Sequence, residues 1–178
     1  MARRQVRPER PVYPSPAGLV TSADADGRPN IITLGEIFNV SISEPVILGI
    51  AVRKERWSHR LLSQTRQFVV NLPTCRIAAA VWQCGRCSGR DTDKFAVTGL
   101  TALPATQVRP PLIAECPVNI ECQVIGIQEV GDHDLFLGQA LAQHVDEAVL
   151  DGAGNIVVDR LDGFALVAGQ FRALGRQL

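Results

Sequence analysis

Apolar residues along the chain recur mainly with the spacing of β-strands. The stretch "GLVTSADADGRPNIITLGEIFNVS" contains two β-type runs, and "DADG" at residues 24–27 between them predicts a hairpin. "EPVILGIAV", residues 44–52, is a continuous apolar run of strand length, which predicts a strand buried on both faces. "QFVVNL" predicts a further strand. The first half of the chain is therefore predicted to be mostly sheet.

The second half has the same character. Two long β-type runs, "NIECQVIGIQEV" and "DLFLGQALAQHV", are joined by "GDHD", which predicts a second hairpin, and "NIVVDRLDGFALVAGQFRAL" predicts two short strands. Short helices are predicted at "SHRLLSQT", with Ser58 as its N-cap, and at "RIAAAVWQC". About seven strands with two or three short helices predict an antiparallel barrel.

Length and charge set the class of protein. A chain of 178 residues with 46% hydrophobic residues has the size of one domain with a substantial core. Its 18 basic and 18 acidic residues do not favour nucleic acid or a membrane surface as a partner. Residues 1–11 are rich in arginine and are predicted to be a flexible basic tail rather than a partner-binding arm, which leaves 12–178 as a single domain. With no signal-peptide or membrane-spanning run, we expect a soluble cytoplasmic protein.

The five cysteines are predicted to be reduced thiols, because the number is odd and no secretion signal precedes them. Cys84 and Cys87 form one CxxC in "QCGRCSG". No second pair of ligands completes a tetrahedral zinc site, so no metal is expected. Two packed or surface thiols are favoured over a redox dithiol for this pair.

Sequence signatures of nucleotide and hydrolase sites are missing. The chain contains no GxGxxG after a strand, no GxxxxGK[ST], no GxSxG and no HExxH. Any chemistry must therefore come from a site assembled across several strands.

The segment "AVRKERWSHRLL" is the first candidate for such a site. It carries Arg53, Lys54 and Arg56 directly before Ser58 and His59, where a helix is predicted to begin. Free N–H groups at a helix start, neighbouring cations and a hydroxyl favour phosphate binding. An N-capped helix beside a solvated basic loop explains the same residues.

The segment "CSGRDTDKFAVTGL" is the second candidate. Ser88, Gly89 and Arg90 are predicted to form a turn with exposed amides, and a short helix is predicted to start within 91–94. Lys94 suits a phosphate or a carbonyl oxygen, although a surface pair with aspartate explains it equally well. His133, in "GDHDLFLG", is either a solvated turn residue or a group facing a ligand.

Taken in order, these segments resemble the flavin reductase-like, or flavoredoxin-type, family of FMN-binding split-barrel proteins. The resemblance runs from about Gly18 to about Asp146, and "SGRDTDKF" and "GDHDLFLG" are its most specific parts. It implies a mainly β fold, a Greek-key split β-barrel with short peripheral helices. It also implies a homodimer that holds FMN in a groove near the subunit interface.

The resemblance also assigns roles to individual residues. His133 matches a histidine near the redox face of the ring and is the candidate catalytic residue. The FMN-binding residues that it implies are Asn30, Thr33, Leu34 and Gly35 beside the ring, Arg53, Lys54, Ser58 and His59 at the phosphate, Asn71 near the flavin, and Ser88, Gly89, Lys94 and Phe95 in a loop over the cofactor.

One position departs from the family. Members often show Thr-x-Ser-Trp where this chain has Thr33, Leu34, Gly35 and Glu36. A Glu36 side chain facing the flavin would disfavour the anionic reduced form, since like charges repel at low dielectric. Exposure to solvent or to an interface is favoured over that orientation, and strand alternation alone does not decide between them.

The function that follows is hydride transfer from NADH or NADPH to FMN, with electrons passed on to an acceptor. The first alternative is a flavoredoxin-like electron carrier with bound FMN and a redox partner protein, in which Cys84 and Cys87 serve as an accessory dithiol. The second alternative is a split-barrel scaffold that binds flavin weakly or not at all.

Overall fold

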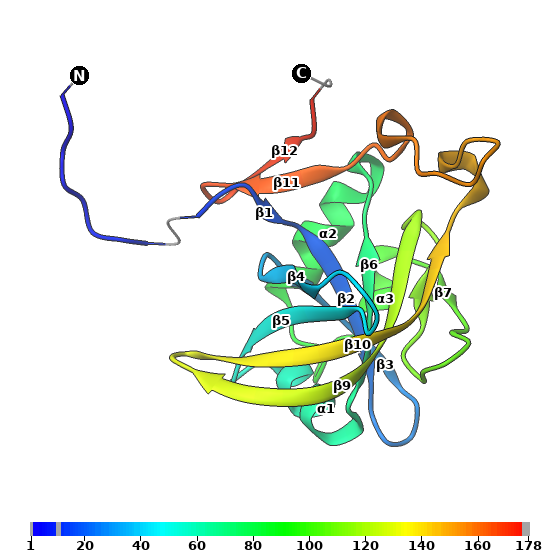
Figure 1. Ribbon diagram of the computed structural model, residues 1–178. Coiled ribbons are helices and arrows are strands. Elements are labelled where there is room, and N and C mark those ends of the chain that lie inside the picture. Colours follow the sequence, from blue (N-terminus) through cyan, green and yellow to red (C-terminus); the bar gives the residue numbers. More distant parts are fainter. Residues whose placement is uncertain (1, 10–11, 176–178) are drawn as a thin grey trace.

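The computed structural model describes residues 2–9 and 12–175 (Figure 1). Its helices are α1 (Trp57–Thr65), α2 (Ala78–Arg86), α3 (Lys94–Thr98) and three short 3-10 turns, η1 (Cys75–Ile77), η2 (Glu147–Val149) and η3 (Val158–Arg160). Its strands are β1 (Ser15–Pro16), β2 (Gly18–Ala23), β3 (Pro29–Leu34), β4 (Ile37–Ser41), β5 (Ile47–Arg53), β6 (Gln67–Leu72), β7 (Ala102–Leu103), β8 (Leu112–Ile113), β9 (Val118–Val130), β10 (His133–Val145), β11 (Phe164–Val167) and β12 (Gln170–Ala173).

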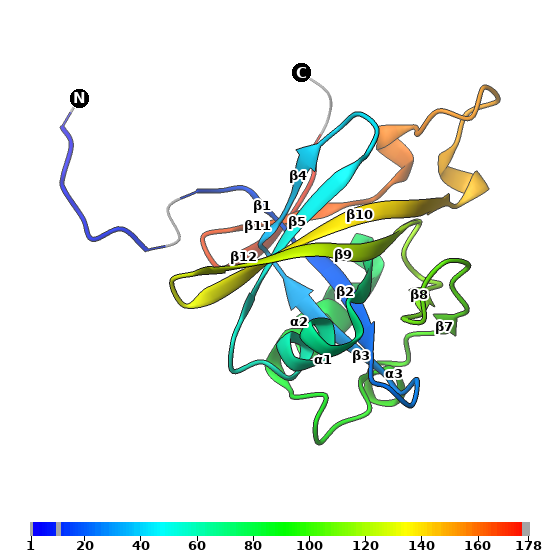
Figure 2. The same cartoon turned by 60° about the horizontal axis from the view of Figure 1, so that its bottom comes forward.

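A seven-stranded antiparallel sheet forms the body of the protein, in the order β3-β2-β6-β9-β10-β5-β4. The β9–β10 pair is the longest, and two register shifts between the paired strands increase its bend. The sheet curls so that β2 and β3 lie behind β9 and β10, as in a barrel that is open on one side (Figure 2). The mainly β barrel predicted from the sequence is thus confirmed.

Aromatic side chains fill the curled sheet where glycine makes room on a neighbouring strand. Phe68 and Phe136 are fully buried in the core that the sheet encloses. A Cβ added at Gly138 would lie 2.4 Å from the ring of Phe68, so only glycine fits there. Burial of side chains of this size gives the sheet its largest hydrophobic contribution.

The helices lie on β2 and β3 (Figure 2). Helix α2 contacts both strands, and Val81 and Cys84 of α2 belong to a second buried cluster with Leu19 and Ile31. A small sheet of β1, β11 and β12 covers one end of this second cluster. No helix among residues 2–9 and 12–175 is long and apolar enough to cross a membrane.

Both predicted hairpins are present. β2 and β3 join through the Asp24–Gly27 turn, in which Gly27 has φ +85°, and β9 and β10 join through Gly131 at φ +59°. The predicted tail has no regular structure at residues 2–9, which are exposed and extend away from the sheet (Figure 1). Met1, Arg10 and Pro11 of that tail lie outside the described residues, as do residues 176–178.

The predicted start of α1 needs correction, whereas α3 begins within the predicted range 91–94. Helix α1 begins at Trp57, its N-cap position is Arg56, and no side chain caps it. Ser58 was predicted as the cap but lies inside the first turn, because its hydroxyl contacts Asn30 instead. Helix α3 begins at Lys94, and the carboxylate of Asp93 caps it by accepting from the Ala96 amide at 3.2 Å.

Candidate functional site

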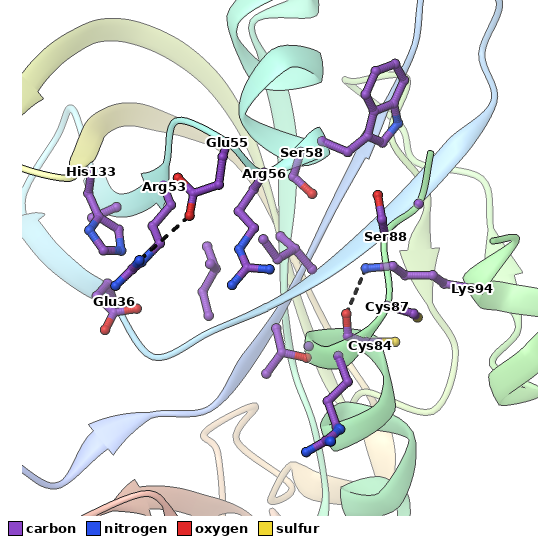
Figure 3. A pocket seen from close by; sticks show the side chains of 18 residues that line it. Glu36, Arg53, Glu55, Arg56, Ser58, Cys84, Cys87, Ser88, Lys94 and His133 are labelled. Carbon is purple, nitrogen blue, oxygen red and sulfur yellow. Dashed lines mark hydrogen bonds and ion pairs between the residues drawn. The ribbon is translucent and has the colours of Figure 1, made fainter. Parts of the chain in front are cut away.

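A cavity of about 330 Å³ opens where β3, β5, the start of α1 and the α2–α3 loop converge (Figure 3). That size is within the range of small-molecule sites. Its walls are formed by Ile32, Thr33, Leu34, Glu36, Ala51, Arg53, Glu55, Arg56, Trp57, Ser58, Cys84, Gly85, Arg86, Cys87, Ser88, Gly89, Lys94 and His133.

One end of the cavity is formed by strand ends. Arg53 at the end of β5 faces His133 at the start of β10, because these two residues are paired across the sheet. The guanidinium of Arg53 contacts Asp132 at 3.1 Å and Glu55 at 3.7 Å, and Nδ1 of His133 lies 2.6 Å from an oxygen of Asp132. Glu36 reaches the same end (Figure 3). We call this the strand end.

The opposite end holds a buried cation. Lys94 is only 5% exposed, and its Nζ donates to the carbonyl oxygens of Ile31 at 2.6 Å and Cys84 at 2.7 Å. Burial lowers the pKa of this amine below its ordinary value. Within the described residues Lys94 forms no ion pair, so its charge is compensated by carbonyl dipoles alone. A buried ammonium in such surroundings favours an anion in the cavity.

One arginine adds to this charge. Arg56 precedes α1 and points into the cavity (Figure 3), and in the described part of the chain its guanidinium has no carboxylate partner. Arg86 at the end of α2 also lines the cavity, but its guanidinium carbon lies 6.0 Å from the ring centroid of Trp82, a residue outside the cavity wall. Ser58 is 3% exposed and accepts from the amide of Asn30 at 2.7 Å, which leaves its own hydrogen available to a ligand. Lys94, Arg56 and Ser58 together form the cationic end.

The loop over the cationic end is fixed by a glycine. A Cβ added at Gly89 would lie 1.8 Å from Oδ1 of Asn30, so the loop backbone rests directly on that amide. The Oδ1 atom itself is buried without a hydrogen-bond partner. Asn30 therefore lies one layer beneath the cavity wall, where it holds Ser58 and the loop together rather than lining the cavity.

Several residues predicted from the sequence do line the cavity. Thr33 contributes to its floor, and its hydroxyl donates to the Val81 carbonyl, which joins β3 to α2. The predicted residues that the structure brings together are Thr33, Leu34, Glu36, Arg53, Ser58, Ser88, Gly89, Lys94 and His133. Gly35 connects two of these wall residues without lining the cavity itself.

Lys54 and His59 were predicted to contact the phosphate, but they do not line the cavity. Both turn to the far side of the β5–α1 connection, where the Nζ of Lys54 pairs with Glu129 and Nε2 of His59 lies 2.8 Å from Asp134. These contacts lower the pKa of Asp134, chiefly through its hydrogen bond with His59. The Arg56 amide donates a hydrogen bond to the Arg53 carbonyl and closes a turn. In this turn Arg53 and Arg56 line the cavity, whereas Lys54 lies on the other side.

Asn71 and Phe95 are also placed elsewhere. Asn71 is fully buried in the sheet, donates to the Leu19 carbonyl at 3.1 Å, and accepts from the Ile113 amide at 3.0 Å and from Asn119 at 2.8 Å. Its amide is thus fully occupied in holding strands together. Phe95 packs against the second buried cluster and does not line the cavity.

Glu36 lines the cavity, and its exposure to solvent or to an interface, favoured from the sequence, stays a prediction. It is half-buried and lines both this cavity and a second hollow of about 870 Å³. Glu36, Arg53 and His133 form the boundary between the two, and Tyr13, Leu166 and Gly169 lie on the far wall of the second. The strand end therefore opens onto a space large enough for a second ligand.

Arg86 and Trp57 are among the wall residues that sequence reasoning did not assign, whereas Arg56 was named in the first candidate segment but not among the FMN-binding residues. The signal for Arg56 was its spacing, three residues from Arg53 in a turn, whereas Arg86 required the position of α2 against β3.

Cys84 and Cys87 form no disulfide with each other, and they differ in burial. Cys84 is fully buried, and burial raises the pKa of its thiol to about 11, whereas Cys87 is half-buried on the cavity wall. This geometry favours a packed thiol for Cys84. No group of three or more His, Cys, Asp or Glu side chains suited to a metal is found among residues 2–9 and 12–175.

Comparison with known proteins shows which family the chain belongs to. The model described as "Flavin reductase like domain" matches residues 10–165. The chain belongs to the flavin reductase-like family. This confirms the resemblance inferred from the sequence.

Relatives of this flavin reductase-like protein span most of its length. A protein of Archaeoglobus fulgidus is 34% identical over 145 residues, 82% of this chain and 80% of its own. A flavin reductase of Pseudomonas putida is 26% identical and covers 75% of each chain. The solved flavoredoxin of Desulfovibrio vulgaris (Miyazaki F) superposes with a TM-score of 0.91 at 26% identity, covering 99% of this chain and 96% of that one.

The cavity of this flavin reductase-like protein fits a phosphorylated flavin. A cavity with cations at one end suits a ligand with an anionic group, and the buried ammonium of Lys94 favours such a partner. Gly89, where a side chain would collide with Asn30, lets the loop backbone approach the ligand closely.

Proposed function

We propose that the protein binds FMN in this cavity and acts as an oxidoreductase that accepts a hydride from NADH or NADPH. The observation that carries the proposal is the cationic end, where Lys94 and Arg56 converge without carboxylate partners among the described residues. A phosphate at that end would receive charge-assisted hydrogen bonds from these side chains and from the hydroxyl of Ser58. The flavin ring would then lie toward the strand end, over Thr33 and Leu34.

The protein's own residues have positioning tasks in this scheme. When bound, the flavin supplies the two-electron and one-electron chemistry. Arg56 and Lys94 hold the phosphate, and the Gly89 loop shields it from water. His133, fixed by Asp132 at the boundary between the two hollows, is suited to orient the nicotinamide or to hold a proton beside the ring. The second hollow is large enough to admit the electron donor or acceptor.

A flavoredoxin-like electron carrier is the second candidate. It is supported by the similarity to the flavoredoxin of Desulfovibrio vulgaris over nearly the whole of both chains. In that case the flavin stays bound and the electrons pass to a partner protein. We also propose that the protein is a homodimer and that it works in the cytoplasm. The five unpaired cysteines are consistent with a reducing compartment.

The test is an absorption spectrum of the purified protein after incubation with FMN and removal of free ligand by gel filtration. We expect a retained flavin band near one per chain, bleached under nitrogen by NADH or NADPH and restored by air. The matched variants are Lys94→Met, which removes the buried charge at the cationic end, and Lys54→Met, which removes a lysine on the far side.

Each outcome decides between the candidates. Retention that Lys94→Met abolishes and Lys54→Met leaves intact supports the site. Fast bleaching by a pyridine nucleotide supports the reductase, and retention with slow bleaching but rapid electron exchange with a ferredoxin-type protein supports the carrier. A protein that neither retains flavin nor oxidises NADH or NADPH with free FMN contradicts both.

A further inference from the structure

The second hollow adjoins the candidate flavin cavity through shared residues. Glu36, Arg53 and His133 line both spaces, and Figure 3 shows all three at the strand end. The volume of the second hollow, about 870 Å³, is large enough for a polycyclic small molecule. A ligand in it would therefore lie directly beside the ring of a flavin bound at the strand end.

One wall of the second hollow is apolar. Tyr13, which is 57% exposed, lines this wall together with Leu166 of β11. β1 holds the segment in place, since Ser15 pairs with Leu166 across the two strands. The β11–β12 turn completes the wall with Ala168 and Gly169, at φ +47° and +81°, so no side chain larger than a methyl group projects from the turn. Such a surface suits a planar ring that stacks on the aromatic side chain.

The opposite wall offers hydrogen-bond donors but little free charge. Among the described residues, Arg53 is the one lysine or arginine that lines the second hollow. Its guanidinium is 3.1 Å from Asp132 and 3.7 Å from Glu55, so carboxylates already compensate its charge. A guanidinium has several N–H groups, and these contacts leave some of them for a ligand. The wall therefore favours an uncharged acceptor oxygen over a phosphate or a carboxylate.

The two spaces thus differ in the ligand charge that they select. At the cationic end, Lys94 and Arg56 have no carboxylate partners in the part of the chain that the structure describes, which favours an anion. In the second hollow Arg53 is paired, and the carboxylates of Glu9 and Asp132 also line the space. These carboxylates would repel a polyanion, whereas they would not repel a neutral molecule.

We propose that the second hollow binds a neutral quinone, with its ring on Tyr13 and one carbonyl oxygen at Arg53, and that the protein reduces it to the hydroquinone. The inference rests on the proposed flavin-binding function and names its electron acceptor. A quinone is planar and uncharged, and its carbonyl oxygens accept the hydrogen bonds that a paired guanidinium can still donate. Reduction adds a hydride, which leaves the reduced flavin and forms one O–H bond. A proton from water at the exposed side of the hollow forms the other O–H bond, and the flavin is left oxidised.

The first test is binding, measured by equilibrium dialysis of the full chain after incubation with FMN. The probes are anthraquinone carboxamide, which is neutral, and anthraquinone carboxylate, which has nearly the same shape and a negative charge. We expect the carboxamide to bind at least about fivefold more tightly. Tyr13→Ala should weaken it by about fivefold or more because the stacking ring is lost, and Tyr13→Phe should keep the dissociation constant within about twofold. The control Leu103→Ala, at an exposed position that lines neither space, should change nothing.

The second test is electron transfer. Protein-bound flavin is reduced with dithionite under nitrogen and mixed with duroquinone, a neutral quinone that does not alkylate thiols, or with ferricyanide, a small anion that needs no stacking surface. We expect Tyr13→Ala to slow reoxidation by duroquinone about fivefold or more and to leave reoxidation by ferricyanide within about twofold of the wild type. Retention of FMN should be the same in both proteins, because Tyr13 does not line the first cavity.

The outcomes separate this inference from the function on which it rests. If the wild type retains flavin but binds the two anthraquinones equally, or binds neither, the quinone inference alone is overturned. It is also overturned if Tyr13→Ala and Tyr13→Phe bind the carboxamide alike, or if Tyr13→Ala leaves reoxidation by duroquinone unchanged. A wild type that retains no flavin overturns the proposed function and, with it, the reduction step. Binding of the carboxamide that depends on Tyr13 in such a chain would still support the second hollow as a quinone site.

Discussion

Gly89 is the residue on which the loop over the cationic end depends. Its backbone occupies the space between Oδ1 of Asn30 and the indole of Trp57, where a methyl group would approach the oxygen to 1.8 Å. Both neighbours are held in place, Asn30 by its bond to Ser58 and Trp57 by its position at the start of α1. The loop therefore cannot accommodate a larger residue without moving.

We expect Gly89→Ala to lower the free energy of unfolding by about 1–3 kcal/mol, since overpacking forces neighbours off their positions. Retention of flavin should fall as well, because the loop has to lift from the cavity. Chemical denaturation and gel filtration with FMN measure the two effects. The matched control is Gly152→Ala, at a glycine with nothing within 4 Å, which should leave both unchanged. Equal behaviour of the two variants would show that the loop is not held at Gly89.

Lys94 contributes to ligand binding at a cost in stability. Burial lowers the pKa of its amine, which means that the folded protein disfavours the charged form. We expect Lys94→Met to weaken flavin binding by at least about tenfold. The same change should leave the ligand-free protein as stable as the wild type or more so, since it removes a buried charge. Thermal unfolding with and without FMN checks both parts, and a variant that loses stability without losing flavin would contradict the assignment.

Cys84 and Cys87 should differ in reactivity. A thiolate is the reactive form, and burial raises the pKa of the Cys84 thiol to about 11, so Cys84 stays protonated and covered at neutral pH. We expect iodoacetamide at pH 8 to modify Cys87 at least about tenfold faster than Cys84, as followed by peptide mass spectrometry. Equal modification rates for the two thiols would instead support the hypothesis that Cys84 and Cys87 act as a redox dithiol.

Residue roles were predicted from the sequence only where local geometry decides them. Ser88, Gly89 and Lys94 stand in one turn and its following helix, and the structure brings all three to the cavity. Lys54 and Arg56 could not be told apart, because the turn that sends one to Glu129 and the other to the cavity depends on β10. Asn71 was misplaced since its partners Leu19, Ile113 and Asn119 come from distant segments.

Among the structural elements, the segment from Thr106 to Val108 is held by one buried carboxylate. Glu121 on β9 is fully buried, accepts from the amides of Thr106 at 2.9 Å, Gln107 at 2.6 Å and Val108 at 3.0 Å, and contacts Nε2 of His144 at 2.6 Å. Burial raises the pKa of this carboxyl, but the hydrogen bonds outweigh that effect and lower it from 4.5 to about 2.

The sign of the pH dependence follows from this lowered pKa. The charged form is favoured in the folded state, so the stabilisation is complete above the unfolded value of 4.5 and is lost as the pH falls toward about 2. We expect the free energy of unfolding to drop by at most about 3 kcal/mol over that window. In Glu121→Gln the fall in the free energy of unfolding over this pH window should be smaller than in the wild type. The variant should be less stable than wild type at pH 7 by about 1–3 kcal/mol, because the Gln amide cannot accept all these bonds.

Urea denaturation at several pH values between 2 and 7 measures how the free energy of unfolding depends on pH in the wild type and in Glu121→Gln. Glu147→Gln, on η2, is the control, because its carboxyl holds no such segment and the change should leave the slope of the wild type. A Glu121→Gln variant with the unchanged wild-type slope would show that another carboxyl controls acid unfolding.

Strands were easier to predict than helix starts for a physical reason. The hairpins at Asp24–Gly27 and Gly131 follow from turn residues that carry their own backbone preference. Helix α1 starts at Trp57 without a capping side chain, so no local signal marks that position, and the burial of Ser58 depends on Asn30 from β3. The edges of elements that depend on tertiary contacts could not be predicted from local sequence.

At the scale of the whole molecule, β4 is an edge of the seven-stranded sheet and carries exposed apolar side chains. Phe38 and Val40 on β4 are 46% and 49% exposed, and Ile42, directly after the strand, is 83% exposed. An exposed apolar edge is a site for pairing with another chain. This surface is the one we expect to be covered in the proposed homodimer.

We therefore expect light scattering after size exclusion to give about twice the mass of one chain, and the double variant Val40→Lys/Ile42→Lys to shift it to a monomer, since two charges at the edge oppose pairing. The control, Val6→Lys/Val158→Lys, adds the same charge at positions that are 73% and 68% exposed and lie away from β4, and it should remain dimeric. A wild type that is monomeric at micromolar concentration contradicts the homodimer. If both double variants stay dimeric, the dimer forms through another face of the sheet, and β4 is only a solvated edge.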